Sequence, residues 1–463
     1  MLPVRPFRRL NLIEYRGRRK EPTLPSILAL LLGIGFIIHL LYLDHQQFPE
    51  ASLGLWIPTI WLLTVSTKAL GTWFGTTGSF VMEEGSSLDR NFLLILMGIA
   101  IIMLIRRKPS LAEILQENVW LIVLFAFMLI SISWSQVPFI SLKRWMREVI
   151  AIIMGLVITT EKNPRRAIET VVRRAVYILI PLSIVLIKYY PQYGVDYVGW
   201  SGMTMWIGVT DQKNEFGQLT CFAALFLIWS LWRRRGRTDS QKIRYMKITD
   251  LAVLAIALYL TKGAEAGYSA TSLVMLVFGL LLYAGLLWLK KKGKIVSQSA
   301  VTAFIGFLIL YGTLTPLIGR LPVVDITSSL GRDSTLTERT INWAALVPSA
   351  TAKPLLGHGV GGFWTTVRVG RYYFPAHNGY LEVILVLGFI GLLIVSFYLL
   401  SSARKAWVLL TGEYDWGVLW ICWLAMALLN NITESSLNSF ANLLMAVPLW
   451  LALSHKVRVG QSP

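Results

Sequence analysis

The sequence predicts an all-α polytopic integral membrane protein with about 12–13 transmembrane helices and one long extracytoplasmic loop. Three observations predict this class. First, 55% of the 463 residues are apolar and only 15% are charged, whereas a soluble domain carries about a quarter charged residues. Second, the apolar residues gather in runs, most of them long enough to cross about 30 Å of hydrocarbon as helices. Third, the basic residues concentrate in short segments between those runs, as they do in positive-inside loops.

Net charge and cysteine content argue against two other classes, nucleic-acid-binding proteins and disulfide-rich scaffolds. Lys and Arg number 44 against 25 Asp and Glu, which gives a net charge of +19. In a soluble chain this excess would suggest nucleic acid. Here the basic segments flank apolar runs and lack interleaved aromatic side chains, so we expect membrane lipids and no nucleic acid as partners. The two cysteines, Cys221 and Cys422, both lie inside apolar runs, which excludes a disulfide scaffold.

Each apolar run is expected to form one helix that crosses the membrane, with its two ends on opposite sides. The runs fall at 26–43, 52–68, 91–105, 118–134, 145–160, 174–189, 217–232, 248–261, 269–289, 297–315, 379–400, 416–430 and 437–454. With the C-terminal Lys456 and Arg458 inside, every basic loop back to Arg106 also falls inside. The first two runs leave two counts open. Thirteen spans place the basic N-terminus outside, whereas twelve place it inside.

These boundaries divide the chain into five segments. A basic arm at 1–25, assigned to the cytoplasm with its sidedness open, precedes N-terminal transmembrane helices at 26–315. A large outer loop follows at 316–378, then C-terminal transmembrane helices at 379–455 and a cytoplasmic tail at 456–463. The outer loop is the only hydrophilic segment large enough for its own substructure. Long loops of this kind are usually functional.

Two arginines in the outer loop are candidates for binding phosphate. Arg332 and Arg339 lie seven residues apart, with Ser and Thr between them. A guanidinium group can hold a phosphate through two parallel hydrogen bonds. The competing interpretation is an ordinary solvated loop.

The outer loop ends at His377, the candidate for acid–base chemistry. It stands at the mouth of an apolar run, directly before Asn378 and five residues before Glu382. Histidine is the side chain that changes charge near neutral pH, so it can accept a proton from a substrate. His358 is the rival, but its glycine neighbours favour a turn. No zinc-binding spacing and no D-x-D pair occur in the sequence, so we expect no metal site.

A second polar cluster, DQKNE at 211–215, stands where another apolar run begins. Polar residues at that position are costly unless they face a cavity. Lys213 is a candidate to meet a phosphate as a point charge, and Asn214 is a candidate to bind a sugar hydroxyl. The competing interpretation is a lysine that reaches past the apolar run to water.

Taken together, these stretches resemble the O-antigen ligase and bacterial polysaccharide polymerase family. The resemblance rests on GVTDQKNEFG at 208–217, SATSL at 269–273, GRDSTLTERTINW at 331–343, PLLGHGVGGFW at 354–364 and AHNGYLEVILVLGFIGLL at 376–393. The upstream segments WIPTIW, SISWSQVPFISLKRW and PLSIVLIKYYP are similar to an exopolysaccharide-production branch. In one respect the chain departs from the family. Where the family commonly reads Thr-Gly-Arg-Thr, this chain has Glu338 before Arg339, and a carboxylate there would weaken the grip of the arginines on phosphate.

The resemblance implies a glycosyltransferase of the bacterial inner (cytoplasmic) membrane with a periplasmic active site. The donor would be a glycan on undecaprenyl diphosphate and the acceptor a second glycan or lipid A-core, with membrane lipids and other polysaccharide-assembly proteins as partners. No cofactor and no metal are implied, because the diphosphate leaving group is already activated. The site would combine a catalytic residue, three diphosphate-binding residues and three substrate-binding or supporting residues, which are His377, then Arg332, Arg339 and Lys213, then Asn214, Asn378 and Glu382.

Two alternatives remain open at the level of the sequence. Within the family, a ligase moves finished glycan to lipid A-core, whereas a polymerase extends another lipid-linked glycan. The upstream segments slightly favour the polymerase. The alternative from a different class is a membrane transporter or flippase of lipid-linked sugars. Such transporters tend to show two related halves with interrupted spans at matching positions, and the sequence shows no such symmetry.

Overall fold

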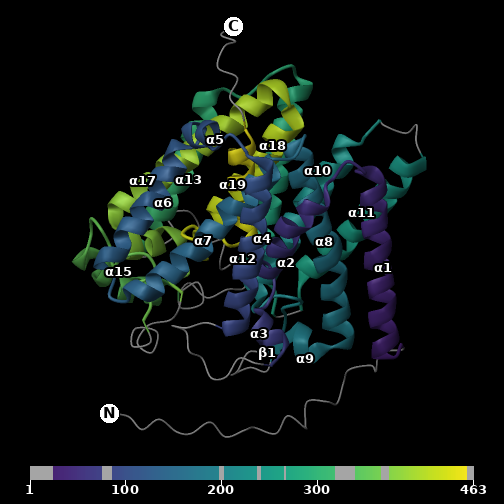
Figure 1. The fold of residues 1–463 in the computed structure, drawn as a ribbon, viewed down its shortest axis with the longest axis horizontal. Coiled ribbons are helices and arrows are strands. Elements are labelled where there is room, and N and C mark those ends of the chain that lie inside the picture. Colours follow the sequence, from purple (N-terminus) through teal and green to yellow (C-terminus); the bar gives the residue numbers. More distant parts are fainter. Residues whose placement is uncertain are drawn as a thin grey trace, which may run out of the picture.

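The computed structural model describes residues 24–75, 86–197, 203–236, 241–264, 267–318, 339–365 and 375–455 (Figure 1). Its helices are α1 (Ser26–Gln47), α2 (Trp56–Val65), α3 (Leu70–Trp73), α4 (Ser87–Arg107), α5 (Leu111–Glu117), α6 (Val119–Ile130), α7 (Pro138–Thr159), α8 (Pro164–Tyr189), α9 (Pro191–Gly194), α10 (Lys213–Arg233), α11 (Gln241–Lys262), α12 (Ala270–Lys291), α13 (Gln298–Ile318), α15 (Arg339–Ala352), α17 (Gly379–Gly412), α18 (Tyr414–Asn430) and α19 (Leu443–Ser454). Short 3-10 helices cover Leu53–Leu55 and Ser131–Trp134. The strands β1 (Val195–Tyr197) and β2 (Thr204–Trp206) pair antiparallel.

Every predicted apolar run contains a helix, so the all-α membrane class is confirmed. Among the described residues, seven helices are long and apolar enough to cross a membrane. The number rises to eight if Leu111–Glu117 and Val119–Trp134, which are bent by 92°, form one span. Three apolar helices are shorter, namely Leu53–Val65, α18 and α19. The count of 12–13 spans therefore stays a prediction.

Basic residues from distant parts of the sequence gather at one end of the bundle, which we call the basic face. There Arg107 Nη1 lies 2.7 Å from Glu161 Oε1, and Lys290 Nζ lies 3.6 Å from Asp415 Oδ1. The opposite end, where α10 and α17 begin and α8 ends, is called the site face. A helix of about 20 residues spans roughly 30 Å, so α8, α10 and α17 each reach from one face to the other. This gathering agrees with the predicted positive-inside pattern.

The first helix runs antiparallel to α8. Asp44 Oδ2 accepts a hydrogen bond from Arg174 Nε at 3.0 Å, and a Cβ at Gly33 would lie 2.9 Å from Val185 Cγ2. Ser26 therefore starts α1 at the site face. Most of the arm at 1–25 lies outside the described residues. If the basic face is cytoplasmic, this direction of α1 suits the thirteen-span alternative, in which the chain enters α1 from outside.

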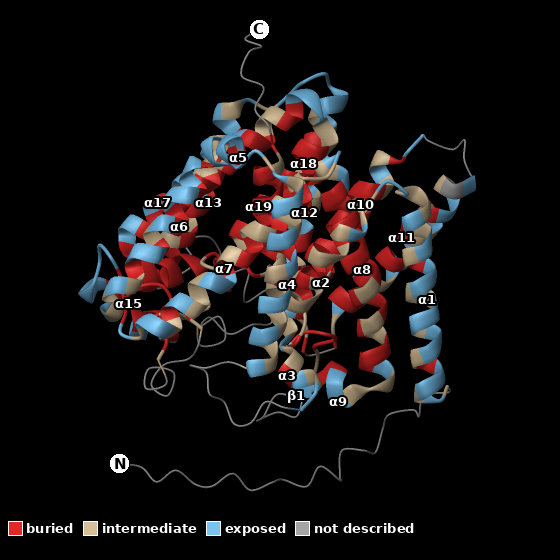
Figure 2. Cartoon of the chain, viewed as in Figure 1, coloured by how far each residue is buried: buried red, intermediate tan, exposed pale blue. Residues whose placement is uncertain are grey.

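Burial separates the inner helices from the outer ones (Figure 2). Of the most apolar 18-residue window, 83% is buried in α8, against 11% in α1 and in α4. The exposed residues of α1 and α4 are largely apolar. Apolar side chains on the outside of a helical bundle are suited to contact with lipid tails. The helices α10 and α17, which begin at the site face, belong to the inner group, since 72% and 61% of their most apolar windows are buried.

A break in α17 shapes the site face. Gly388 has φ 69° and ψ −172°, a backbone conformation almost restricted to glycine. The freed amides of Phe389 and Ile390 donate to the carbonyl oxygens of Pro354 and Leu355 at 2.7 and 3.2 Å. The segment before α17 thus inserts into the break and satisfies its backbone groups, as an apolar environment requires.

A second interruption separates α18 from α19. The apolar run predicted at 437–454 is helical only from Leu443 onward, because a buried carboxylate holds the preceding backbone in another conformation. Glu148 of α7 accepts from the amides of Phe440 and Ala441 at 2.5 and 3.0 Å and from Ser439 Oγ. Hydrogen bonds to a carboxylate are among the stronger kind. They fix the segment 431–442, which we call the α18–α19 connection, at the site face.

Candidate active site

Three segments far apart in the sequence meet at one carboxylate, Glu434. Asn214 Nδ2 donates to Glu434 Oε1 at 2.7 Å, and Arg339 Nη2 forms an ion pair with the same oxygen. His377 Nδ1 lies 3.5 Å from the other oxygen, Oε2. The structure therefore brings together Asn214, Arg339 and His377 of the sequence-predicted residues.

Asn214, Arg339 and His377 each lie at or just before the beginning of a helix. Asn214 lies in the first turn of α10, Arg339 is the first residue of α15, and His377 precedes the first residue of α17 by two positions. Glu434 comes from the α18–α19 connection. Because α10 and α17 both begin here, the positive ends of their helix dipoles point toward the site, an arrangement that favours anions.

The backbone of His377 adopts a left-handed conformation, with φ 50°. This conformation is uncommon for a residue with a side chain and persists only where the surroundings fix it. The neighbouring amides provide that constraint. Ala376 N donates to Glu382 Oε2 at 3.2 Å, and Asn378 N donates to Ser435 Oγ at 3.1 Å. The imidazole is thereby aimed at Glu434.

His377 remains accessible while Glu434 does not. The side chain of His377 is 24% exposed and that of Glu434 is 6% exposed. Nδ1 of the imidazole is buried and has no hydrogen-bond partner within the described ranges. At 3.5 Å from Glu434, Nδ1 is slightly beyond hydrogen-bond length, and catalytic hydrogen bonds are often long before substrate binds. The arrangement can orient the ring and leave Nε2 for a substrate.

Asn378 has a structural place. It is fully buried, its Oδ1 accepts from Leu381 N at 2.8 Å as the N-cap of α17, and its Nδ2 donates to the carbonyl oxygens of Gly312 and Ile432 at 3.2 and 3.0 Å. These contacts join α13, α17 and the α18–α19 connection. Its sequence-predicted role in support or substrate binding thus remains a proposal, with support favoured by the geometry.

Glu382 is buried one turn into α17. Its Oε1 accepts from Trp364 Nε1 at 2.5 Å, and its Oε2 accepts from Ala376 N. The carboxylate therefore ties both ends of the loop segment between Trp364 and His377 to α17. This geometry favours the supporting role that the sequence suggested.

The remaining sequence-predicted residues are Arg332 and Lys213, together with Glu338. Arg332 and Glu338 lie outside the described residues, so the effect of Glu338 stays a prediction. Lys213 is the first residue of α10, is half-buried, and lies beside Asn214. The cation that forms an ion pair with Glu434 is Arg339.

His358 is held away from this cluster. Its Nδ1 lies 2.9 Å from the carbonyl oxygen of Leu385, and its own amide donates to the same oxygen at 3.0 Å. The ring also packs edge-on against Phe363, with centroids 5.0 Å apart. These contacts make His358 part of the packing around the break in α17, as its glycine neighbours suggested.

The buried side chain of Lys68 and the exposed side chain of Asp211 interact electrostatically near the start of α10. Lys68, which follows α2, donates through Nζ to the carbonyl oxygen of Tyr193. Burial lowers the pKa of its ammonium group, and the Asp211 and Asp196 carboxylates oppose this shift. Burial raises the pKa of Asp211, which Lys68 partly offsets. The two groups therefore stabilise each other's charged form beside the start of α10.

Sequence reasoning missed Glu434. It stands in NNITESSLNS at 430–439, a polar stretch between two apolar runs at the site face. That composition was the available signal, because a polar interruption near a membrane face is costly unless it is functional or paired. No group of three or more His, Cys, Asp and Glu side chains that could hold a metal is present in the described part of the chain.

Fold and site define a polytopic α-helical membrane protein with a polar cluster at one membrane face. Residues 251–396 match the family described as O-antigen ligase. The chain is also 23% identical over 303 residues to the exopolysaccharide production protein ExoQ of Rhizobium meliloti. That alignment covers 61% of this chain and 64% of ExoQ, so it spans less than two thirds of the relative's length. The predicted resemblance to the O-antigen ligase and polymerase family, in its exopolysaccharide branch, is confirmed.

The family match and the site overlap only in part. The matched residues run from α11 into α17 and include Arg339 and His377. Asn214 and Glu434 lie on either side of the matched range. Segments on both sides of that range therefore complete the polar cluster.

Proposed function

We propose that the protein is a membrane glycosyltransferase of the O-antigen ligase and polysaccharide polymerase type. It transfers a saccharide from undecaprenyl diphosphate to a hydroxyl of an acceptor sugar at the outer face of the bacterial inner membrane. The observation that carries the proposal is the convergence of His377, Arg339 and Asn214 on Glu434 at one membrane face. A partly exposed base beside a cation suits attack by a hydroxyl on a diphosphate-linked sugar.

His377 acts as the general base in this proposal. The acceptor hydroxyl gives its proton to Nε2 of the imidazole as its oxygen forms a bond to the anomeric carbon. The bond between that carbon and the diphosphate oxygen breaks, and its electron pair leaves with the lipid diphosphate. Glu434, 3.5 Å from Nδ1, stabilises the imidazolium that forms and holds the ring.

Arg339, Arg332 and Lys213 bind the diphosphate. Arg339 engages Glu434 through Nη2, and a guanidinium has five N–H donors, so other donors remain for a phosphate oxygen. Negative charge grows on the leaving diphosphate as the glycosidic bond breaks. Cations fixed beside it stabilise that charge more in the transition state than in the ground state.

A growing lipid-linked glycan is our proposed acceptor, which makes the protein a polymerase. The similarity to an exopolysaccharide production protein supports this choice. Transfer to lipid A-core, the ligase reaction, is the alternative for the same site, because both reactions use a sugar hydroxyl and the same leaving group.

The test uses purified protein in proteoliposomes with a radiolabelled undecaprenyl-diphosphate saccharide. Unlabelled lipid-linked saccharide and lipid A-core are supplied as rival acceptors. Polymerase activity is expected to convert the label into a ladder of lower gel mobility with the first acceptor. Label attached to lipid A-core would indicate a ligase. Label that crosses the bilayer with unchanged mobility would indicate a transporter and contradict the proposal.

The reaction is proposed to need no divalent metal. The cations of the site supply the charge that a metal ion would otherwise provide, and the donor is already activated. Product formation in the same assay is expected to continue in excess EDTA. Abolition by EDTA with rescue by magnesium or manganese would contradict this part of the proposal and direct attention to Asp325, Asp333 and Glu338.

A further inference from the structure

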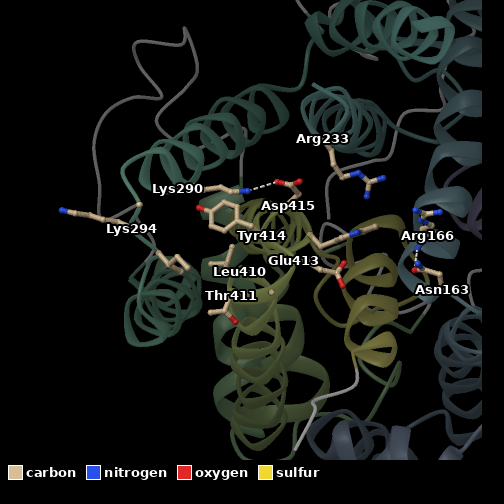
Figure 3. A pocket seen from close by; sticks show the side chains of 14 residues that line it. Asn163, Arg166, Arg233, Lys290, Lys294, Leu410, Thr411, Glu413, Tyr414 and Asp415 are labelled. Carbon is tan, nitrogen blue, oxygen red and sulfur yellow. Dashed lines mark hydrogen bonds and ion pairs between the residues drawn. The ribbon is translucent and has the colours of Figure 1, made fainter. Parts of the chain in front are cut away.

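A large open cleft lies on the basic face, on the side of the bundle opposite to the proposed active site (Figure 3). Its volume is about 760 Å³, and the ends of α8, α10, α12, α17 and α18 line it. Arg166 and Arg233 lie on one side of the opening, and Lys290 and Lys294 lie on the other. The proposed glycosyl transfer does not use any of these residues.

The acidic residues of the cleft are already engaged. Glu413 forms an ion pair with Arg165, and Asp415 lies 3.6 Å from Lys290. Arg166 is exposed and has no ion-pair partner among the residues that the structure describes. The cleft therefore offers more positive charge than its own carboxylates neutralise.

A buried ionic network adds to this excess. It joins α1, α8, α10 and α11 and contains three carboxylates against four guanidinium groups, which are Asp44, Glu169, Asp250, Arg173, Arg174, Arg233 and Arg234. One positive charge is thus left over. Arg233 is the only one of the seven that lines the cleft; it pairs inward with Glu169, and its guanidinium stacks 4.4 Å from the ring of Trp229. Buried charges require compensation, and the cleft is where a counter-anion can reach this network.

The cleft also carries an exposed apolar side chain, because Ile295, which follows α12, lines it and is 51% exposed. An exposed apolar side chain near the membrane surface is suited to contact with acyl chains. An anion with acyl chains could place its charge in the cleft and a chain against Ile295, whereas a free anion would leave this apolar side chain uncovered.

We propose that the cleft binds the phosphate of an anionic phospholipid, with Arg166, Arg233 and Lys290 around the head group. Basic pockets between membrane helices near the cytoplasmic side recognise such head groups. The bound lipid would neutralise the excess charge of the network that joins α1 to the inner helices. The site is independent of the proposed transfer reaction.

The experiment measures lipid binding to the purified full-length protein by native mass spectrometry. Phosphatidylglycerol and phosphatidylcholine are titrated in parallel into wild type, Arg166→Ala/Lys290→Ala and Arg106→Ala/Arg244→Ala. The control pair also removes two exposed arginines, from α4 and α11, neither of which lines the cleft. A juxtamembrane cation contributes about fivefold to the binding of an anionic lipid, so the cleft variant is expected to bind phosphatidylglycerol about 25-fold more weakly. Wild type and control should bind alike, and phosphatidylcholine should show no difference.

Three outcomes would overturn the proposal. One is equal loss of phosphatidylglycerol binding in the cleft and control variants, which would indicate a diffuse effect of surface charge. Another is equal binding of the two lipids by wild type. The third is that excess inorganic phosphate displaces bound phosphatidylglycerol as effectively as excess phosphatidylglycerol does. This result would identify a free anion as the ligand. If the double variant does not fold, Arg166→Ala alone serves, with an expected loss of about fivefold.

Discussion

At the scale of single residues, the two oxygens of Glu434 face different partners. Oε1 receives Asn214 and Arg339, while Oε2 faces His377. A carboxylate that is 6% exposed would be costly without such partners. The same carboxylate therefore sets the position of the cation and the orientation of the proposed base.

Replacing Glu434 is predicted to slow transfer without preventing donor binding. Glu434→Gln keeps the size of the side chain but removes the charge that stabilises a protonated His377. We expect single-turnover transfer to fall about 10²-fold, at the lower end of the range for losing the general base itself. Glu113→Gln, the same change on the basic face, is the matched control. Equal rates for the two variants would remove Glu434 from the proposed mechanism.

The proposed diphosphate-binding cations are predicted to lower the activation barrier by stabilising the transition state. Arg339→Ala, Arg332→Ala and Lys213→Ala should each raise the barrier by about 2–4 kcal/mol, the cost of losing one preorganised electrostatic donor. Arg339→Lys should recover little, since a point charge cannot reproduce bidentate geometry. Lys353→Ala removes an exposed cation from the same outer segment and should be near neutral. Full activity in all three alanine variants would leave the diphosphate assignment without support.

At the scale of elements, interrupted helices build the site. The break in α17 at Gly388 accepts the segment that leads to His377, and the α18–α19 connection presents Glu434. A Cβ at Gly388 would lie 2.2 Å from the carbonyl oxygen of Leu355. A side chain at this position would strain the backbone, because φ is positive, and would also collide with the inserted segment.

Gly388→Ala is therefore predicted to destabilise the protein by about 2 kcal/mol or more, from backbone strain and displacement of the inserted segment. Gly285→Ala in α12 is the matched control, because a Cβ there meets nothing within 4 Å and alanine favours a helix. The thermal unfolding midpoint in detergent measures both. An unchanged midpoint for Gly388→Ala would show that the break tolerates a side chain.

These interruptions also show what sequence could and could not predict. Apolar runs long enough to span a membrane predicted the helices, and the outer loop predicted His377 and Arg339, because each signal is local. Glu434 escaped because its role depends on contacts with residues 57, 95 and 220 positions away. The start of α19 at Leu443, later than the apolar run, escaped for the same reason, since Glu148 of α7 holds the preceding backbone.

At the scale of the whole molecule, the two faces differ in chemistry. The basic face carries ion pairs and the cationic cleft, while the site face carries the Glu434 cluster and the inserted loop. This asymmetry matches the positive-inside pattern of the sequence. The proposed reaction requires that the site face be periplasmic.

Sidedness is predicted to follow from this asymmetry. Thr351→Cys in α15 and Ser297→Cys in the α12–α13 turn are both exposed positions, on the site face and the basic face respectively. The native cysteines are buried and give little background. A membrane-impermeant maleimide is expected to label Thr351→Cys in intact spheroplasts and Ser297→Cys only after lysis. The reverse pattern would invert the topology and remove the proposed mechanism.

The central claim is that the partly exposed imidazole beside Glu434 is the general base of a glycosyl transfer. Its most direct test is single-turnover transfer from a radiolabelled lipid-linked donor by wild type, His377→Ala and His358→Ala. His377→Ala is predicted to lose roughly 10²–10⁴-fold in rate while it still inserts and binds donor, as expected for loss of a general base. His358→Ala should retain substantially more activity, because its ring contacts the backbone around the break in α17. Near-normal turnover by His377→Ala would contradict the account.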